Sequence, residues 1–410
     1  MGCEIHNIVD IDTDNMELKS MDTVEMPIFG STLKLMKFWS YLFVHNWRRY
    51  VAMAPYIIIN CTQYVDIYLS TESLDFIIRN VYLAVLFTNT VVRGVLLCVQ
   101  RFSYERFINV LKSFYIELLV STKDYLKNTY CINAVLKQSD DPTINLLVEE
   151  TTRLSVFISR INLLMGCCTC IGFVTYPIFG SERVLPYGMY LPTIDEYKYA
   201  SPYYEIFFVI QAIMAPMGCC MYIPYTNMVV TFTLFAILMC RVLQHKLRSL
   251  EKLKIEQVRG EIIWCIKYQL KLSGFVDAMN ALNTHLHLVE FLCFGAMLCV
   301  LLFSLIIAQT IGQTVIVIAY MVMIFANSVV LYYVANELYF QSFDIAIAAY
   351  ESNWMDFDVD TQKTLKFLIM RSQKPLAILV GGTYPMNLKM LQSLLNAIYS
   401  FFTLLRRVYG

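Results

Sequence analysis

The sequence has 410 residues, of which 58% are hydrophobic and only 16% are charged, and its mean hydropathy is +0.54. A soluble domain is usually about a quarter charged and less than half apolar, so the composition excludes an ordinary soluble enzyme. The chain has 32 basic and 32 acidic residues, and this balance provides no bulk field to attract nucleic acid.

The charges are segregated along the chain. Residues 161–181, 206–240 and 291–336 contain no Asp, Glu, Lys or Arg. An uncharged apolar run of about 18 residues or more is a candidate membrane span, and a helix satisfies its own backbone hydrogen bonds there. The sequence predicts an all-α protein with seven transmembrane helices near residues 50–69, 76–99, 158–180, 205–240, 286–308, 314–336 and 386–406.

Three of these spans have features of their own. The fourth is longer than a bilayer requires and contains Pro216 and Pro224, so it should tilt, kink or continue beyond the membrane. The fifth and sixth are separated only by residues 309–313, which predicts a tight turn.

The distribution of Lys and Arg predicts the orientation. The N-terminal tail and the connections after spans two, four and six carry five, seven, eight and four of them, 24 in all, whereas the opposite side carries four. Because positive residues remain in the cytosol, we expect a cytosolic N-terminus and an external C-terminus. This topology is the reverse of that of a G-protein-coupled receptor.

The expected organisation is a cytosolic N-terminal segment, 1–49, followed by one seven-helix domain, 50–406. The connecting segments near 241–285 and 337–385 place apolar residues at helical spacing among charges. We interpret them as a cytoplasmic helical anchor bundle that extends the membrane helices. They suit subunit contacts or packing within the chain equally well.

The last predicted helix, 386–406, carries a polar stripe. Its members recur at three- and four-residue spacing and fall within an arc of roughly 80°: Gln392, Asn396, Ser400, Thr403 and Arg407. A polar stripe on a membrane helix must face water or a hydrogen-bonding neighbour, so it lines a pore or forms a seam between helices. Gly381, Gly382 and Pro385 interrupt the chain before this helix and could form a hinge or a simple turn.

No pattern of catalytic or metal-binding residues is present. His285 and His287 do not share a helix face, and no Gly-rich phosphate loop or G-x-S-x-G motif occurs. We therefore expect no enzyme activity, no cofactor and no metal.

Two stretches resemble insect odorant receptors. The first, Leu185–Ile213, has the Leu-Pro, the Ser-Pro-x-Tyr-Glu and the following Gln of that family. The second, Asn336–Arg406, contains Tyr350-x-x-x-Trp354, the run Ile369–Pro375 and Tyr399-Ser400-Phe401. The chain lacks the extended loop after span four of the universal co-receptor, so it resembles an odour-tuning subunit.

The resemblance implies a non-selective cation channel of the plasma membrane, in the dendrites of olfactory neurons. Such a receptor assembles with the co-receptor as a heterotetramer, within membrane lipid, and its last helix lines the pore. The pore positions near the external end, Thr403 and Arg407, are polar here but apolar in the co-receptor. A gustatory-type channel or a G-protein-coupled chemoreceptor is the alternative, and a transporter is disfavoured because no internal repeat is visible.

The resemblance also implies an odorant pocket in the outer leaflet. The outer halves of spans two, three, four and six contain aromatic residues, Met and small residues, which suit a volatile, mostly apolar ligand. The candidates are Tyr82, Leu86, Thr169, Gly172, Phe173, Tyr176, Phe207, Ile210, Gln211, Met214, Val317, Tyr320 and Met321. Ordinary helix packing is the alternative role for each of them.

Overall fold

The protein consists of long helices. A computed structural model describes residues 26–44, 46–69, 74–119, 141–175, 185–192, 195–307 and 311–409. Each predicted span corresponds to a helix, in the predicted order, so the all-α expectation is confirmed. These helices are α3 (Arg48–Leu69), α4 (Leu74–Val99), α7 (Pro142–Thr175), α8 (Tyr203–Arg248), α9 (Ile255–Ile307), α10 (Ile311–Tyr350) and α12 (Leu388–Tyr409).

Shorter elements connect them. They are η2 (Pro27–Phe29), α2 (Thr32–Phe38), α5 (Arg101–Leu119), η5 (Asp195–Tyr197), η6 (Ser249–Lys252), η7 (Trp354–Asp356), α11 (Val359–Ser372), β1 (Leu379–Val380) and β2 (Tyr384–Pro385). Residues 309 and 310 of the predicted turn and residues 1–25 and 45 of the N-terminal segment lie outside the described residues, and residues 311–313 already belong to α10.

Five segments in the described part of the chain are long and apolar enough to cross a membrane: Asn80–Val99, Pro142–Gly172, Tyr203–Lys252, Glu256–Ile307 and Ile311–Tyr350. The other two predicted spans, α3 and α12, are helices of 22 residues each with a more polar composition. In α3 the polar residues Asn60, Gln63 and Asp66 are turned inward and buried. This arrangement suits a helix whose polar side is covered by protein.

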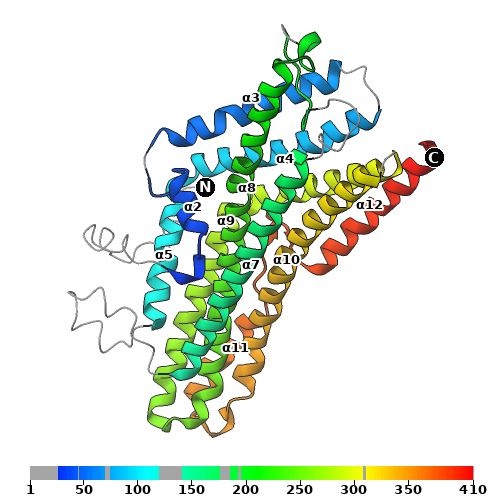
Figure 1. The fold of residues 1–410 in the computed structure, drawn as a ribbon. Helices are drawn as coiled ribbons and strands as arrows, with labels where there is room; N and C mark the ends of the chain where they lie inside the picture. The colour runs from blue at the N-terminus through cyan, green and yellow to red at the C-terminus, as the bar shows by residue number, and fades with distance from the viewer. Residues whose placement is uncertain are drawn as a thin grey trace.

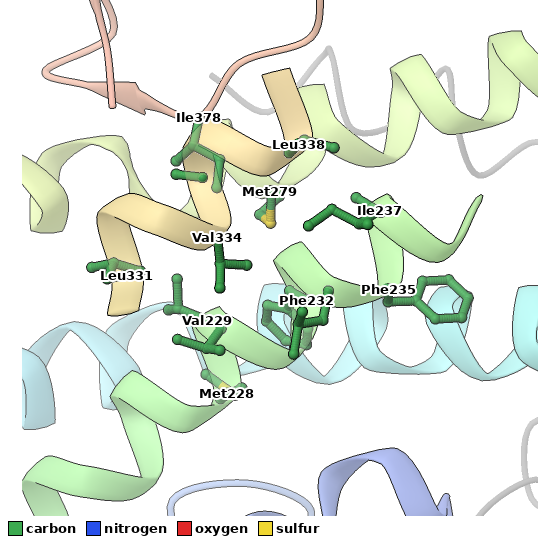
Figure 2. Packing of buried hydrophobic residues seen from close by; sticks show 14 of the residues in the cluster. Met228, Val229, Phe232, Phe235, Ile237, Met279, Leu331, Val334, Leu338 and Ile378 are labelled. Carbon is green, nitrogen blue, oxygen red and sulfur yellow. The ribbon is translucent and has the colours of Figure 1, made fainter. Parts of the chain in front are cut away.

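Helix α8 forms the centre of the molecule. Its residues from Ile223 to Cys240 are all buried, because α7, α10, α9 and α2 surround it. Figure 2 shows Phe232 and Phe235 of α8 beside Met279 of α9 and Val334 of α10. Aromatic rings strengthen this core: Phe235 and Phe275 have centroids 5.6 Å apart in an edge-on arrangement.

Pro216 and Pro224 do not end α8, which continues through both to Arg248. Tilting, kinking and continuation beyond the membrane were the outcomes predicted for this span, and the structure shows a helix that continues past residue 240. Helices α8 and α9 meet at η6, and α10 turns back through η7 into α11, so both turns lie at one end of the molecule (Figure 1). The segments 241–285 and 337–385 run through this end.

Side-chain contacts hold that end together. Gln244 of α8 donates to the carbonyl of Gln341 in α10 over 2.8 Å, and His245 Nε2 lies 2.8 Å from Asp141 Oδ2 at the start of α7. Burial alone would raise the pKa of the Asp141 carboxyl, but the contacts with His245 and Thr143 outweigh it and lower that pKa.

Candidate ligand cavity and pore-facing helix

A cavity with about 810 Å³ of empty space lies between α4, α7, α8 and α10, where it is lined mostly by apolar and small side chains. The lining residues are Leu83, Leu86, Phe87, Thr90, Asn162, Gly166, Thr169, Cys170, Tyr187, Ala215, Gly218, Cys219, Tyr222, Ile223, Tyr320, Met323, Ile324 and Asn327.

Three of the predicted ligand-binding residues line this cavity: Leu86, Thr169 and Tyr320. Tyr82 does not line the cavity but packs against Tyr320, and their ring centroids are 6.0 Å apart. Of the four spans predicted to contribute, spans two, three and six each place a predicted residue in the lining, whereas the lining residues of span four are not the predicted ones.

Two further candidates are buried but engaged elsewhere. The side-chain amide of Gln211 donates to the carbonyl of Tyr187 and accepts from its backbone N–H, both over 3.0 Å. The carbonyl of Met214 accepts a hydrogen bond from the Tyr56 hydroxyl. Gln211 thus holds the segment that carries Tyr187 in place and does not border the cavity.

The remaining candidates are dispersed. Ile210 is 43% exposed on the outside of α8 and Phe207 is half-buried, whereas Val317 is buried beside the cavity without lining it. Gly172 has open space where a Cβ would be. Met321 borders a different groove, shared with Leu395 and Ile398 of α12. The side chain of Phe173 and all of Tyr176 lie outside the described residues.

Sequence reasoning missed Tyr187, which lies in the loop before α8 and closes one side of the cavity. The loop approaches α3 and α4 so closely that a Cβ on Gly188 would lie 2.5 Å from Asn80 Nδ2. Beside it, Asn80 Nδ2 donates to Asp66 Oδ2 over 2.7 Å, and Lys198 Nζ lies 3.5 Å from Asp66 Oδ1. A charged residue inside the first predicted span and a lysine in the loop between the third and fourth spans were the signal for this contact.

Apart from Thr169, sequence reasoning also missed the small residues of α7 and α8 that line the cavity. Gly166, Thr169 and Cys170 recur at three- and four-residue spacing, as do Ala215, Gly218 and Cys219, so each set shares one helix face. Both sets line the cavity, and Cys170 Sγ lies 3.0 Å from Cys219 Sγ. A small-residue face allows two helices to approach closely and leaves room for a ligand.

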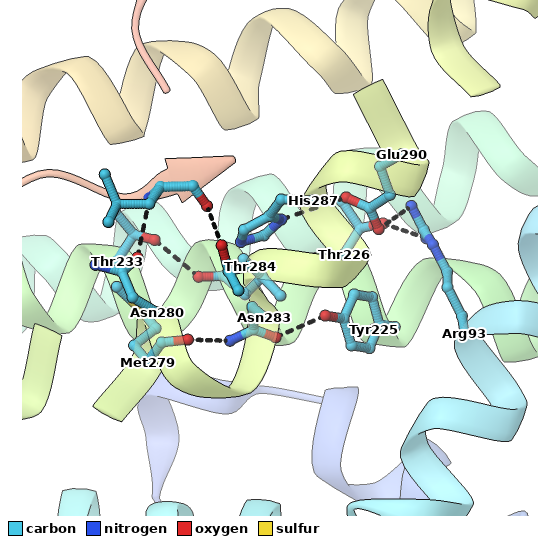
Figure 3. Close-up of polar contacts among 12 residues, drawn as sticks. Arg93, Tyr225, Thr226, Thr233, Met279, Asn280, Asn283, Thr284, His287 and Glu290 are labelled. Carbon is cyan, nitrogen blue, oxygen red and sulfur yellow. Dashed lines mark hydrogen bonds and ion pairs between the residues drawn. The ribbon is translucent and has the colours of Figure 1, made fainter. Parts of the chain in front are cut away.

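Beyond the cavity, a buried ion pair joins α4 to α9. Arg93 Nη2 lies 2.7 Å from Glu290 Oε1, and Arg93 Nη1 also donates to the carbonyl of Tyr222 over 3.0 Å and to Thr226 Oγ1 over 2.8 Å. The guanidinium lies 3.7 Å from the centre of the Tyr222 ring. Figure 3 shows this group at one end of a row of polar α9 side chains.

The other end of that row holds the turn before α12. Asn280 Nδ2 donates to the carbonyl of Ala377, Asn280 Oδ1 accepts from the N–H of Leu379, and the carbonyl of Thr284 accepts from the N–H of Gly381. Strands β1 and β2 form a hairpin in which Gly381 and Gly382 have φ of 61° and 75°. These values favour glycine, and the predicted break is therefore an ordered turn fixed to α9.

Helix α12 packs its apolar side against α9 and α10 through Leu391 and Ile398 (Figure 1). The five stripe residues are exposed on the other side: Gln392, Asn396, Ser400, Thr403 and Arg407. The Ser400 hydroxyl donates to the carbonyl of Asn396 and the Thr403 hydroxyl to that of Ser400. The stripe thus faces away from the rest of its own chain.

Known proteins are similar to this chain over most of its length. Residues 73–399 match the family model described as 7tm Odorant receptor. The chain is 93% identical to Odorant receptor 30a of Drosophila melanogaster over 395 residues, 96% of this chain and 100% of that protein. It is 36% identical to Odorant receptor 10 of Aedes albopictus, over 94% of this chain and 98% of that one.

A solved structure shares the fold. The olfactory receptor OR5 of Machilis hrabei in complex with eugenol superposes with a TM-score of 0.76 over 97% of this chain and all of that chain, at 15% identity.

The buried ion pair predicts a stability test. Glu290→Ala leaves the Arg93 guanidinium buried without its partner, which should cost about 3–5 kcal/mol of unfolding free energy. Replacing both residues with Met should recover most of that loss. The midpoint of denaturation in detergent, followed by size-exclusion chromatography, measures it.

The control is the half-exposed pair of Arg248 and Glu351, whose charged atoms are 2.8 Å apart, against 2.7 Å in the buried pair. Glu351→Ala should cost no more than about 1 kcal/mol. Equal losses at Glu290 and Glu351 would contradict the assignment of a structural role to the buried pair.

Proposed function

The chain belongs to the insect odorant receptor family, and we propose that it is an odour-tuning subunit that opens a cation channel together with the family's co-receptor. The observation that carries the proposal is the combination of an apolar cavity between α4, α7, α8 and α10 with an exposed polar face on α12. The protein is not an enzyme.

The cavity is the proposed odorant site. Leu86, Thr169 and Tyr320, together with Tyr187, supply an aromatic and aliphatic surface with a few hydroxyl groups. None of the described lining residues is charged, which supports an uncharged ligand and disfavours amino acids or quaternary amines. A volatile, mostly apolar molecule would be bound there by burial of its surface.

The exposed face of α12 is the proposed pore lining. A membrane helix does not present side-chain amides such as those of Gln392 and Asn396 to lipid, because their polar groups would be unsatisfied there. In one chain nothing among the described residues covers them. In a heterotetramer of this chain and the co-receptor, these polar side chains would face a water-filled axis between neighbouring subunits instead of lipid.

The distribution of Lys and Arg supports a cytosolic N-terminus and an external C-terminus in the plasma membrane. With this orientation α12 would run outward and Arg407 would lie at the external mouth of the pore. The dendrite of an olfactory neuron is the site that this function implies.

The first experiment measures currents in cells that express this chain with and without the co-receptor, during application of an odorant panel. We expect odorant-gated cation current only from the pair, because the chain contributes one wall of a shared pore. Robust odorant current from this chain alone would contradict its role as an obligate heteromer subunit.

A second prediction concerns the cavity wall. Tyr320→Ala should raise the half-activating odorant concentration roughly tenfold or more, since a lost aromatic wall removes about 1.5–3 kcal/mol of contact. Tyr333→Ala, on the same helix but 56% exposed, is the control and should change it little. Dose–response curves measure both, and equal shifts would assign Tyr320 to packing alone.

The third prediction concerns the pore mouth. A positive charge at Arg407 should lower the local cation concentration, so Arg407→Glu should raise single-channel conductance at low salt. The effect should shrink in about 1 M salt, where the Debye length is about 3 Å. Single-channel recording measures it.

Arg406, about 100° round the helix and exposed as well, is the matched control for that charge reversal. Arg406→Glu should alter conductance much less than Arg407→Glu. If the two reversals behave alike at every salt concentration, the stripe does not line the conduction path.

A further inference from the structure

A second, polar chamber adjoins the apolar cavity. Its lining includes Asn89 of α4, His287 and Glu290 of α9, and Asn327 of α10, around about 530 Å³ of empty space. The chamber and the cavity share three wall residues: Tyr222, Ile324 and Asn327. The two spaces are therefore neighbours across one short stretch of α8 and α10.

The chamber contains unused hydrogen-bonding capacity. The His287 side chain is only 1% exposed, and neither ring nitrogen has a hydrogen-bond partner among the described residues. Its Nδ1 is turned toward Glu290 Oε2 over 3.6 Å, a contact longer than a hydrogen bond that Figure 3 marks as an ion pair, whereas Nε2 has no contact of either kind among the described residues. Asn89, 1% exposed on the α4 wall, likewise has an unpaired Oδ1. Buried polar atoms normally have partners, so these atoms point to a bound polar group.

The formal charges of the chamber are already satisfied. Arg93 lies 2.7 Å from Glu290 and also donates to Thr226 Oγ1 and the carbonyl of Tyr222. A carboxylate or an ammonium group entering the chamber would have to compete with this pair at the cost of its own desolvation. A neutral hydroxyl, carbonyl or N–H group would not.

We propose that the polar chamber binds the hydrogen-bonding group of a neutral ligand whose apolar body occupies the adjoining cavity, with His287 and Asn89 as its partners. The ligand class is then a small apolar molecule carrying one alcohol, carbonyl or N–H group. This inference rests on the proposed function and assigns a polar subsite to it. The chamber is also lined by Met386, which directly follows β2 and leads into α12. The ligand's polar group would thus bind near the base of the proposed pore helix.

The test uses pairs of molecules that match in size and differ in one polar atom: ethylbenzene and benzyl alcohol, styrene and benzaldehyde, heptane and 1-hexanol. Each is applied to cells expressing the chain with the co-receptor, as an agonist or, where it is silent, as a competitor of an active compound. The readout is the ratio of effective aqueous concentrations within each pair. Transfer from water to membrane is identical for every variant, so a change in the ratio reports the site alone.

His287→Leu should reduce the preference for the polar member about tenfold, the effect of one buried hydrogen bond, and leave the potency of the apolar member nearly unchanged. His287→Gln, which can still donate and accept, should retain the preference. His285→Leu is the matched control, because His285 is exposed on the same helix two residues away.

If His287→Leu gives no current with any compound, Asn89→Leu on the opposite wall is measured in the same way. An unchanged ratio in the variant that conducts would mean that the chamber holds only water, and the proposal would be wrong. Failure of the proposed function has a different signature, since the unmodified pair of subunits would then respond to no odorant at all.

Discussion

The row of polar side chains on α9 is the constraint on which the arrangement of the other helices depends. Asn280, Asn283, Thr284, His287 and Glu290 fall within an arc of about 120° on one face of α9. Polar groups in an apolar interior need partners, so this row fixes the rotation of α9. Asn283 Oδ1 accepts from the hydroxyls of Tyr104 and Tyr225, Glu290 pairs with Arg93, and Asn280 holds the hairpin before α12. One helix face thereby sets the positions of α4, α5, α8 and the start of α12 (Figure 3).

The helices could be predicted from the sequence because a membrane-spanning backbone has few possible conformations. A backbone in hydrocarbon must satisfy its own hydrogen bonds, and uncharged runs such as 291–336 have few alternatives to a helix. The continuation of α8 through Pro216 and Pro224 was one of several open outcomes, since tertiary packing decides whether a helix survives a proline. Nothing in local sequence indicated that Gly381 and Gly382 form a hairpin pinned by Asn280, because that contact joins residues about 100 positions apart.

The site was predictable only in part, for a geometric reason. Composition identifies helices that could line a cavity, but the side chains at it depend on how each helix is rotated. Tyr320 and Met321 are adjacent in the sequence and about 100° apart on α10, so one lines the cavity and the other a groove against α12. Gln211 was predicted to contact ligand on its chemistry, yet its amide is used by Tyr187. The pairing of Arg93 with Glu290 needed the fold as well, since helical spacing alone does not say which spans are neighbours.

The same rotation argument bears on how a ligand could affect the pore. On α10, Tyr320, Ile324 and Asn327 share the face toward the cavity, and Asn327 also borders the polar chamber. About 100° round the helix, Met321 packs in the groove with Leu395 and Ile398 of α12. A helix in a close-packed bundle moves as a rigid unit, so a ligand that shifts or rotates α10 by a small amount changes its contact with α12 without any intervening chain of residues. The hairpin that precedes α12 is held by a different helix, α9, through Asn280 and Thr284. Movement of α10 relative to α9 is therefore the motion that would displace the exposed polar face of α12 while its start stays fixed.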